Sequence, residues 1–394
     1  MNRIAVTGMG IISAIGTSVA DCRAALVSGR SGIVQPNGLL SRYTHLPAGR
    51  VSLTDNQLKE QLGITDASVN RTTLLALHAL NQAVAQADLT STDLAEPGSA
   101  LIVASTIGGV SLTDEIYQNG HGDGADATFL NAYGYSSVAD YLQRKLNIGG
   151  VTDTINTACS SSANAIIYGY RLLKNGFARR AIVGGADCLS KFTVNGFNAL
   201  RILSDEPCRS FDANRKGLNL GEGAAFLILE REEDLAGKPV LAWVSGYGNA
   251  NDAFHPSSLS AEGNGPFMAM QTALNVAGLQ PEDIGYINAH GTGTENNDEA
   301  ESQAMLRLFG RPPAFASTKT FTGHTLGAAN AIETAFSILS LQHGEVYANL
   351  NFSTPAEPAQ LTPVTEYYQT DLQHVMSNSF GFGGNCTSVI VSRA

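Results

Sequence analysis

The sequence predicts an α/β fold that is built from two similar halves. Two observations carry this prediction: apolar runs of strand length alternate with stretches of helical spacing, and short segments recur in the same order. Continuous apolar strands separated by helices are typical of sheets that helices cover. The chain has 394 residues, 43% of them hydrophobic and 15% charged, so it can bury a large core.

Local patterns predict the individual elements. Strands are expected at residues 4–6, 100–104, 151–155 and 180–185, and helices at 74–87 and 163–173. Gly8 and Gly10 come directly after the first strand, and they predict that it enters a glycine turn. They also interrupt the N-terminal apolar run, which argues against a secretory signal peptide.

Three pairs of segments repeat along the chain. The pairs are 1–10 with 239–248, 163–166 with 329–332, and 224–230 with 386–391. The first pair is a strand followed by Gly-x-Gly, and the second is Ala-Asn-Ala-Ile opening an apolar helix, displaced by 166 positions. Each match is short, but their common order indicates a duplication. We therefore expect a boundary near Gly237, with one half at 1–237 and the other at 238–394.

Charge and cysteine content exclude several classes of protein. The net charge of −11 argues against a general nucleic-acid-binding surface, which needs a basic face. No apolar run reaches the roughly 18 residues that a membrane-spanning helix needs. Five cysteines without a Cys-x-x-Cys pair argue against a disulfide framework and favour a reducing compartment. We therefore expect a cytoplasmic protein.

Cys159 is the candidate nucleophile. It lies between the predicted strand 151–155 and a predicted helix that begins with small residues. At a helix N-terminus, unpaired N–H groups and the helix dipole favour a thiolate, and the N–H of Cys159 itself can help to bind an oxyanion. A lone cysteine is more often a small core residue, so this segment alone supports both interpretations equally.

His290 and His324 each follow an apolar strand in a turn rich in Gly and Thr. Moved back by the repeat distance of 166, position 324 falls on 158, beside Cys159. Duplicated halves usually pack about a pseudo-twofold axis, so the two helix starts are expected to converge on one pocket.

A thiol beside two imidazoles predicts acyl transfer with a second oxyanion to stabilise. Two neutral imidazoles can each donate an N–H to a thioester carbonyl and so support an enolate. A metal site is the competing interpretation, with Asp298 as the available third ligand, but the two histidines lack local ligand spacing. We expect no metal and no cofactor, since neither a Walker A motif nor a full dinucleotide fingerprint is present.

Residues 378–385 place three glycines around two phenylalanines. Such a loop can approach a ligand closely, and one phenylalanine can act as a movable lid. A hairpin turn with aromatic residues in the core fits the same pattern.

These four segments, in this order, resemble the β-ketoacyl-acyl carrier protein synthases of the elongating types I and II, and the resemblance covers nearly the whole chain. It implies the thiolase fold, with duplicated halves in five α/β/α/β/α layers, and an obligate dimer. It also implies decarboxylative Claisen condensation of an acyl primer with malonyl-acyl carrier protein, in fatty-acid or specialised polyene or polyketide biosynthesis.

The resemblance assigns roles to matching positions. Cys159 in the N-terminal half would hold the acyl chain, and its backbone N–H with that of Phe382 would form the oxyanion hole. In the C-terminal half, His290 and His324 would promote decarboxylation and stabilise the enolate. Lys319 and Glu333 match residues that support the site electrostatically, as the family places them.

Further positions follow from the same resemblance. Ile107, Phe197, Thr292, Thr294 and Phe380 match the substrate pocket, and Arg71 and Arg201 match the docking surface for the acyl carrier protein. Asn288, Glu301, Glu333 and Ser377 fall where some members hold a structural monovalent cation.

Some residues depart from the family pattern. Among them are Asn164, Asn330, Cys386 and the acidic segment 121–126, where many members have a basic pair. These departures weaken an assignment to bulk fatty-acid synthesis and leave room for a specialised pathway with a dedicated carrier. The partner subunit is then either a second copy or a homologous ketosynthase-like chain.

Rival functions meet specific objections. A thiolase would carry a second cysteine in a Cys-x-Gly-Gly setting, and no such cysteine precedes Phe382-Gly383-Gly384. An initiating synthase would replace the second histidine, His324, by asparagine. A noncatalytic chain-length subunit is the main alternative, but such subunits typically lose the nucleophile, whereas Cys159 is present.

Overall fold

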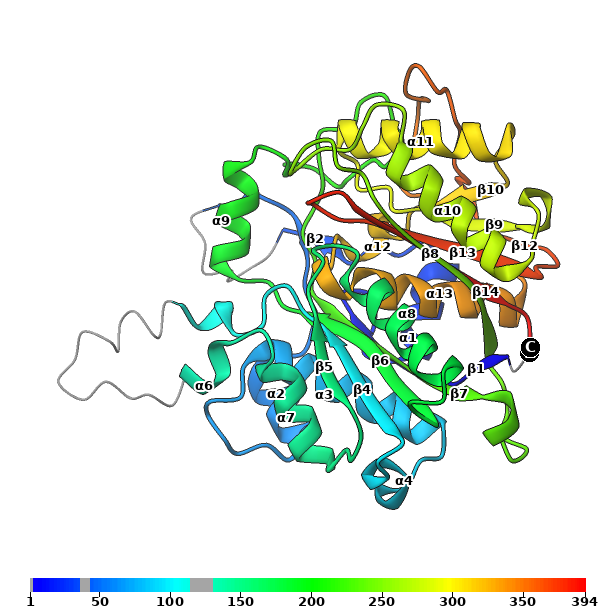
Figure 1. The fold of residues 1–394 in the computed structure, drawn as a ribbon. Coiled ribbons are helices and arrows are strands. Elements are labelled where there is room, and N and C mark those ends of the chain that lie inside the picture. The colour runs from blue at the N-terminus through cyan, green and yellow to red at the C-terminus, as the bar shows by residue number, and fades with distance from the viewer. Residues whose placement is uncertain (1–2, 36–42, 114–129) are drawn as a thin grey trace.

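The computed structural model describes residues 3–35, 43–113 and 130–394 (Figure 1). The acidic segment 121–126 lies outside the described residues. Ten strands form one continuous sheet in the order β10-β9-β13-β14-β8-β1-β7-β6-β4-β5. Their bounds are β1 Ile4–Ser13, β4 Ser99–Ala104, β5 Thr152–Ile155, β6 Arg180–Asp187, β7 Gly223–Arg231, β8 Ala242–Asn251, β9 Tyr286–Asn288, β10 Ala314–Ala316, β13 His374–Phe380 and β14 Asn385–Ser392.

The sheet consists of two halves with the same internal order. From the centre outward, β1, β7, β6, β4 and β5 correspond to β8, β14, β13, β9 and β10. In each half the first two pairings are antiparallel and the last two are parallel. The halves join where residues 4–6 of β1 pair with residues 242–244 of β8. The predicted α/β fold with duplicated halves is therefore confirmed, while the boundary near Gly237 stays a prediction.

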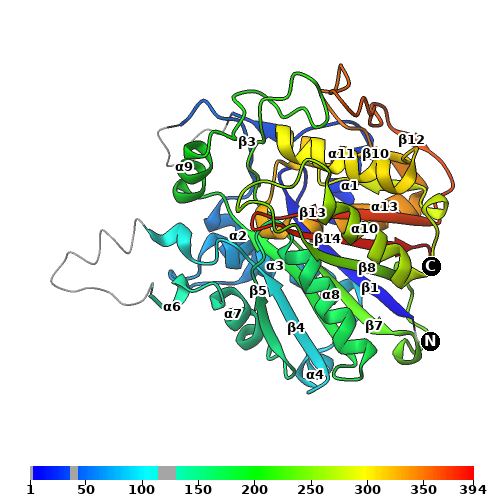
Figure 2. The same cartoon turned by 45° about the horizontal axis from the view of Figure 1, so that its top comes forward.

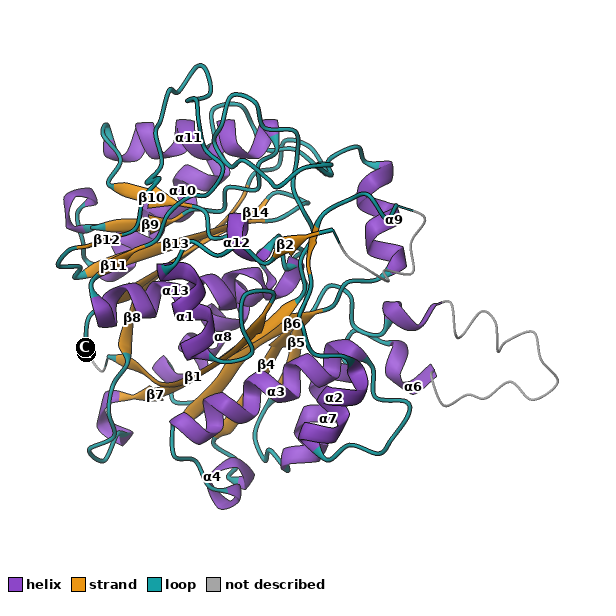
Figure 3. Cartoon of the chain, turned by 180° about the vertical axis from the view of Figure 1, so that it is seen from behind, coloured by secondary structure: helices purple, strands orange, loops and turns teal. Residues whose placement is uncertain are grey.

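Helices cover both faces of each half and complete five layers (Figures 2 and 3). The outer layer of the N-terminal half contains α3 (Arg71–Gln86) and α7 (Ser137–Leu146), and that of the C-terminal half contains α10 (Asn264–Ala277) and α11 (Glu295–Phe309). The middle layer contains α8 (Ser161–Lys174) and α13 (Ala329–His343), which pack against each other and against both halves. Residues 329–341 of α13 are all buried, as expected for a helix that is enclosed on every side.

Shorter elements complete the chain. They are α1 Val19–Val27, β2 Ile33–Val34, β3 Ala48–Gly49, α2 Asp55–Leu62, α4 Ser91–Ala95, α6 Leu130–Tyr133, α9 Lys191–Ala199, α12 Lys319–Thr322, β11 Glu345–Val346 and β12 Tyr368–Gln369. In the described part of the chain, no helix combines the length and the apolar character that a bilayer span requires.

The glycine turn predicted after residue 6 is wrong, because β1 continues through Gly8 and Gly10 to Ser13. These glycines do not turn the strand. Because they carry no side chain, they allow a helix to pack directly against it. A Cβ at Gly10 would lie 2.0 Å from the carbonyl oxygen of Ala79 in α3, and one at Gly248 would lie 1.9 Å from that of Ala269 in α10. The repeated Gly-x-Gly is therefore the contact surface between the first strand of each half and its outer helix.

Candidate active site

Cys159 lies in a tight connection between β5 and α8, two elements of the N-terminal half. The residue before it, Ala158, has a left-handed backbone with φ of 54°, a conformation that costs a non-glycine residue about 1 kcal/mol. Ser161 holds this turn, because its Oγ accepts from the Thr157 N–H at 2.9 Å and donates to the Ala158 carbonyl at 2.5 Å. Cys159 is buried in this turn, with 7% of the whole residue exposed.

Two loops of the C-terminal half hold the histidines. His290 follows β9, and its backbone N–H and that of Gly291 donate to the two carboxylate oxygens of Glu301 at 2.9 and 2.8 Å. His324 follows β10, which corresponds to β5, and its N–H donates to the Asn219 carbonyl at 2.8 Å. The duplicated topology therefore places His324 opposite Cys159, as the repeat distance predicts.

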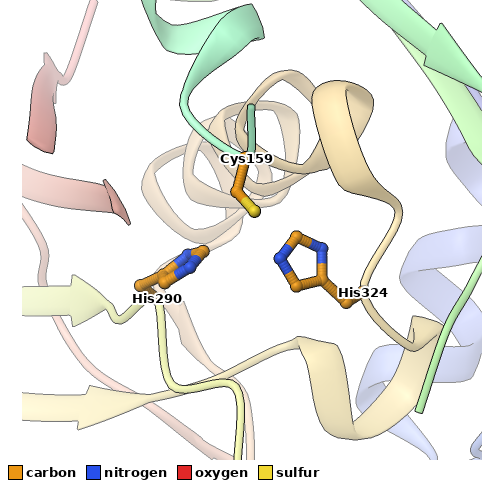
Figure 4. A group of neighbouring side chains, drawn as sticks. All are labelled: Cys159, His290 and His324. Carbon is orange, nitrogen blue, oxygen red and sulfur yellow. The ribbon is translucent and has the colours of Figure 1, made fainter. Parts of the chain in front are cut away.

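The structure brings the three predicted groups together. One ligand atom each from Cys159, His290 and His324 lies within 4.8 Å of the others. The two imidazole rings are 5.4 Å apart between centroids and nearly perpendicular, at 88°. Figure 4 shows the Cys159 sulfur pointing between the two rings. A thiol nucleophile and two N–H donors can thus reach the same substrate carbon and its oxygens.

The histidines are neutral at neutral pH. Burial lowers the pKa of both rings well below the usual range, and the charge of Lys319 lowers both pKa values further. The Leu326 N–H donates to Nδ1 of His324 at 3.0 Å, so the neutral ring carries its proton on Nε2. Among the described residues, that Nε2 has no hydrogen-bond partner, which leaves it available to a substrate oxygen.

The thiol of Cys159 is protonated in the free protein. Burial raises its pKa to about 11, while the Lys319 charge and the backbone N–H groups of Phe382 and Cys159 oppose the shift. The backbone N–H groups thus favour the thiolate, as the sequence predicts, but burial outweighs them. The same two N–H groups are those that the family resemblance assigns to the oxyanion hole.

Lys319 and Glu333 form a buried ion pair beneath the histidines. Burial raises the pKa of Glu333 to about 7, although the Lys319 charge opposes this shift. Four residues match the position where some family members hold a cation, and their oxygen atoms suit a hard monovalent ion. One of these atoms, Oε2 of Glu333, has no hydrogen-bond partner within the described chain. The cation at Asn288, Glu301, Glu333 and Ser377 stays a prediction.

A cavity of about 590 Å³ leads to the three groups. Its lining includes Thr292, Thr294, Phe380 and the two aromatic residues Phe197 and Phe382. The rings of Phe197 and Phe382 stack at 6.1 Å with an angle of 18° between their planes. Phe382 lies in the turn between β13 and β14, so the segment 378–385 is a hairpin connection and also borders the cavity.

Three other predicted residues have different surroundings. Arg201 lines the same cavity, beside its aromatic residues. Ile107 is buried after β4 and is not among the residues that line the cavity in the described structure. Arg71 donates to Glu222 at 2.6 Å and Asp55 at 2.5 Å, and only 10% of its side chain is exposed, so its guanidinium is occupied within the chain.

Sequence patterns did not identify two features of the site. The proton position of His324 depends on a backbone N–H, that of Leu326, which leaves no side-chain signature. The contact of Asn164 with Asn385 joins residues 221 positions apart. The sequence signals were that Asn385 ends the glycine-rich segment 378–385 and that Asn164 is one of the departures from the family pattern.

The comparisons with known proteins agree with this geometry. The family model described as the β-ketoacyl synthase N-terminal domain matches residues 1–235, and the one described as its C-terminal domain matches residues 241–353. The 3-oxoacyl-(acyl-carrier-protein) synthase 2 of Vibrio cholerae is 32% identical, over 99% of this chain and 99% of its own.

Two solved structures are also similar over all of this chain. The ketosynthase ApeO, in complex with its chain length factor ApeC from Xenorhabdus doucetiae, is 34% identical with a TM-score of 0.87, over 98% of that chain. The ishigamide ketosynthase/chain length factor is 29% identical with a TM-score of 0.93, over 99% of that chain. Because both family models match in order and the site retains a thiol with two imidazoles, the chain belongs to the β-ketoacyl synthase family and is a condensing enzyme with the thiolase fold.

Proposed function

We propose that Cys159 accepts the acyl primer from an acyl carrier protein by thioester exchange. The Cys159 sulfur attacks the carbonyl carbon of the acyl thioester, and the N–H groups of Cys159 and Phe382 hold the resulting oxyanion. The carrier thiol then leaves and takes up the proton that Cys159 gives up, so one thioester is exchanged for another. The burial of the Cys159 thiol supports this step, because it shields the acyl-enzyme thioester from water.

His290 and His324 act in the second half-reaction. Their N–H groups donate to the carbonyl oxygen of malonyl-carrier thioester, the carboxylate leaves as CO₂, and its electron pair forms the enolate. The enolate carbon attacks the acyl group on Cys159, and the sulfur leaves as a thiolate that takes up a proton from solvent, which gives β-ketoacyl-carrier protein and the free thiol. The observation that carries this proposal is the pair of neutral imidazoles beside the thiol, one of them with an unpartnered Nε2.

Lys319 and Glu333 have an electrostatic role in this proposal. The positive charge of Lys319 favours both neutral imidazoles and the thiolate that forms during attack. Glu333 keeps that charge in place from α13. Thr292, Thr294 and Phe380 contact the substrate arm, and Phe197 and Phe382 contact the acyl chain, since all five line the cavity.

The direct test is the intact mass of the protein after mixing with acyl-carrier protein. We expect an acyl adduct on the unmodified chain and none on Cys159→Ala. His290→Ala and His324→Ala should still accept some acyl group but should release no CO₂ from malonyl-carrier protein. An adduct that persists in Cys159→Ala, or full decarboxylation in both histidine variants, would contradict the assigned roles.

We further propose a cytoplasmic enzyme that works on carrier-bound substrates and pairs with a homologous ketosynthase-like subunit, in a specialised polyene or polyketide pathway. The complex of the similar ApeO with its chain length factor supports the pairing, and the five free cysteines suit a reducing compartment. Arg201, at the cavity, is the docking residue we favour over Arg71.

The pairing has its own test. Co-expression with a homologous chain should give a 1:1 complex that condenses acyl- and malonyl-carrier proteins, whereas Arg201→Glu should weaken carrier binding and leave the complex intact. A chain that is fully active as a homodimer would remove the need for a second subunit.

A further inference from the structure

The nucleophile loop, residues 156–160, meets the gate turn, residues 381–384, at Cys159. The two segments come from different halves, and Ser379 at the end of β13, just before the gate turn, donates its Oγ hydrogen to the Cys159 carbonyl at 2.8 Å. A Cβ at Gly381 would lie 2.6 Å from the Thr157 carbonyl oxygen and 3.2 Å from the Cys159 nitrogen. Both segments supply a backbone N–H to the thiol, so the angle between these N–H groups depends on how the segments are held together.

One side chain, that of Asn385, joins the two segments. Its backbone carbonyl accepts from the Gly381 N–H at 2.8 Å and closes the gate turn. Its side-chain Oδ1 accepts from Ser160 Oγ at 2.8 Å, and Ser160 directly follows the nucleophile. The same Oδ1 accepts from the Asn164 Nδ2 at 2.8 Å. Asn385 therefore shapes the gate turn with its main chain and holds the nucleophile loop with its side chain.

Asn164 extends this network to a third element. Its Nδ2 also donates to Thr157 Oγ1 at 2.9 Å, and its Oδ1 accepts from Asn249 on β8 at 2.6 Å. Carboxamides do not titrate, so these hydrogen bonds persist across the pH range in which thiols and imidazoles change charge. The network thus fixes the loop and the turn to the central sheet without adding a charge beside the developing oxyanion.

We propose that Asn385 and Asn164 are positioning residues for acyl transfer. Their hydrogen bonds hold the gate turn against the nucleophile loop, so that the N–H groups of Phe382 and Cys159 point at the same substrate oxygen. The inference rests on the proposed oxyanion role of those two N–H groups. It concerns the oxyanion geometry at the Cys159 thioester and leaves decarboxylation at the histidines untouched, because neither asparagine contacts His290 or His324 through a hydrogen bond in the described part of the chain.

The test compares Asn385→Ala, Asn164→Ala and the double variant, with Asn275→Ala on the exposed face of α10 as the control. Single-turnover acylation is followed by intact mass over a range of acyl-carrier concentrations. Each single variant should lower the maximal rate about tenfold, because a misaligned oxyanion donor loses part of the 10²–10³-fold effect of such a donor. The half-saturating carrier concentration should not change. The double variant should be no slower than the slower single variant, since both residues act through one contact.

Decarboxylation of malonyl-carrier protein separates this inference from the proposed function. It should stay within about twofold of the parent in all three variants, as a positioning role in acylation alone requires. Decarboxylation that falls with acylation, or single losses that multiply in the double variant, would overturn the inference. Failure of the proposed function would appear elsewhere, as an acyl adduct that persists in Cys159→Ala.

Asn249→Ala provides an independent variant should those at 385 and 164 fail to fold, because Asn249 is exposed and joins both asparagines to β8 through its own amide. It should lower the maximal acylation rate at least about threefold, as the loss of neutral hydrogen bonds to Asn164 and Asn385 does. A full acylation rate in Asn249→Ala, at an unchanged melting temperature, would likewise overturn the network as a positioning device.

Discussion

Burial shifts the pKa values of neighbouring groups in this site in opposite directions and thereby holds each group in its neutral form. A buried imidazole loses its proton more readily, and a buried thiol keeps its proton, because burial disfavours the charged form of each. The free site is therefore uncharged at the three reacting groups, and Lys319 is the charge that opposes this neutrality at the sulfur. The Cys159 thiolate is therefore a minor form of the free protein at neutral pH.

This leads to a prediction for the pH dependence of alkylation. Iodoacetamide reacts with the thiolate, and the pKa of Cys159 is raised to about 11. The alkylation rate should therefore rise about tenfold per pH unit from pH 7 to pH 10, without the plateau that an ordinary thiol shows above its pKa of about 8.5. Intact mass at timed intervals gives the rate, and Cys159→Ala gives the background from other cysteines. A plateau below pH 9 would show that the thiolate is stabilised in the free protein.

The variant Lys319→Met tests how much the Lys319 charge contributes to the pH dependence of alkylation. Since the lysine charge lowers the pKa of Cys159 and of both histidines, its removal raises all three. Alkylation at a fixed pH should slow, and the acid limb of malonyl decarboxylation should move to higher pH, because the imidazoles protonate more readily. Lys145→Met, on the exposed face of α7, should change neither rate. An unchanged alkylation profile in Lys319→Met would remove Lys319 from the electrostatics of the thiol.

At the scale of the elements, local patterns predicted apolar strands and helices well where packing and propensity agree. The helix predicted at 74–87 is α3, and the strand predicted at 180–185 is β6. The pattern failed at Gly8 and Gly10, where glycine has a low strand propensity but the fold needs a surface without side chains. Only the packing of α3 against β1 explains why glycines stand at these two positions. That packing joins residues far apart in the sequence, so a local pattern does not reveal it.

The glycine contacts predict a specific loss of stability. Gly10→Ala and Gly248→Ala should each lower the free energy of unfolding by about 3 kcal/mol, because the new Cβ would overlap a carbonyl oxygen of the outer helix. Thermal or denaturant unfolding measures this loss. Gly196→Ala in α9 is the control: its Cβ meets nothing within 4 Å, and alanine in a helix should be neutral or slightly stabilising. Equal stability of all three variants would contradict the close approach of strand and helix.

At the scale of the whole molecule, the active site lies where the two halves meet. Cys159 belongs to the first half and both histidines to the second, so neither half contains the complete site. The repeat distance could predict this convergence, because it relates positions in corresponding strands. It could not predict the pKa values or the cavity, since these depend on which side chains of α9, β13 and the gate turn surround the sulfur.

The middle layer predicts how the two halves depend on each other. Side chains of α8 and α13 share one core with strands of both halves, and β1 pairs directly with β8. A protease site inserted at Gly237, which is exposed and has open space around it, should therefore allow cleavage without separation. The fragments 1–237 and 238–394 should stay together in native gel filtration and keep the acylation of Cys159, because the layer buries apolar surface that neither fragment covers alone.

Each fragment expressed separately should be unfolded or insoluble for the same reason, since α13 is buried along most of its length by elements of the first half and its own. Circular dichroism and gel filtration of the single fragments, compared with the cleaved pair, measure this dependence. Fragments that separate under native conditions and remain folded would show two independent domains. In that case a weak contact between the halves, and not the shared core, would bring the Cys159 thiol and the two imidazoles together.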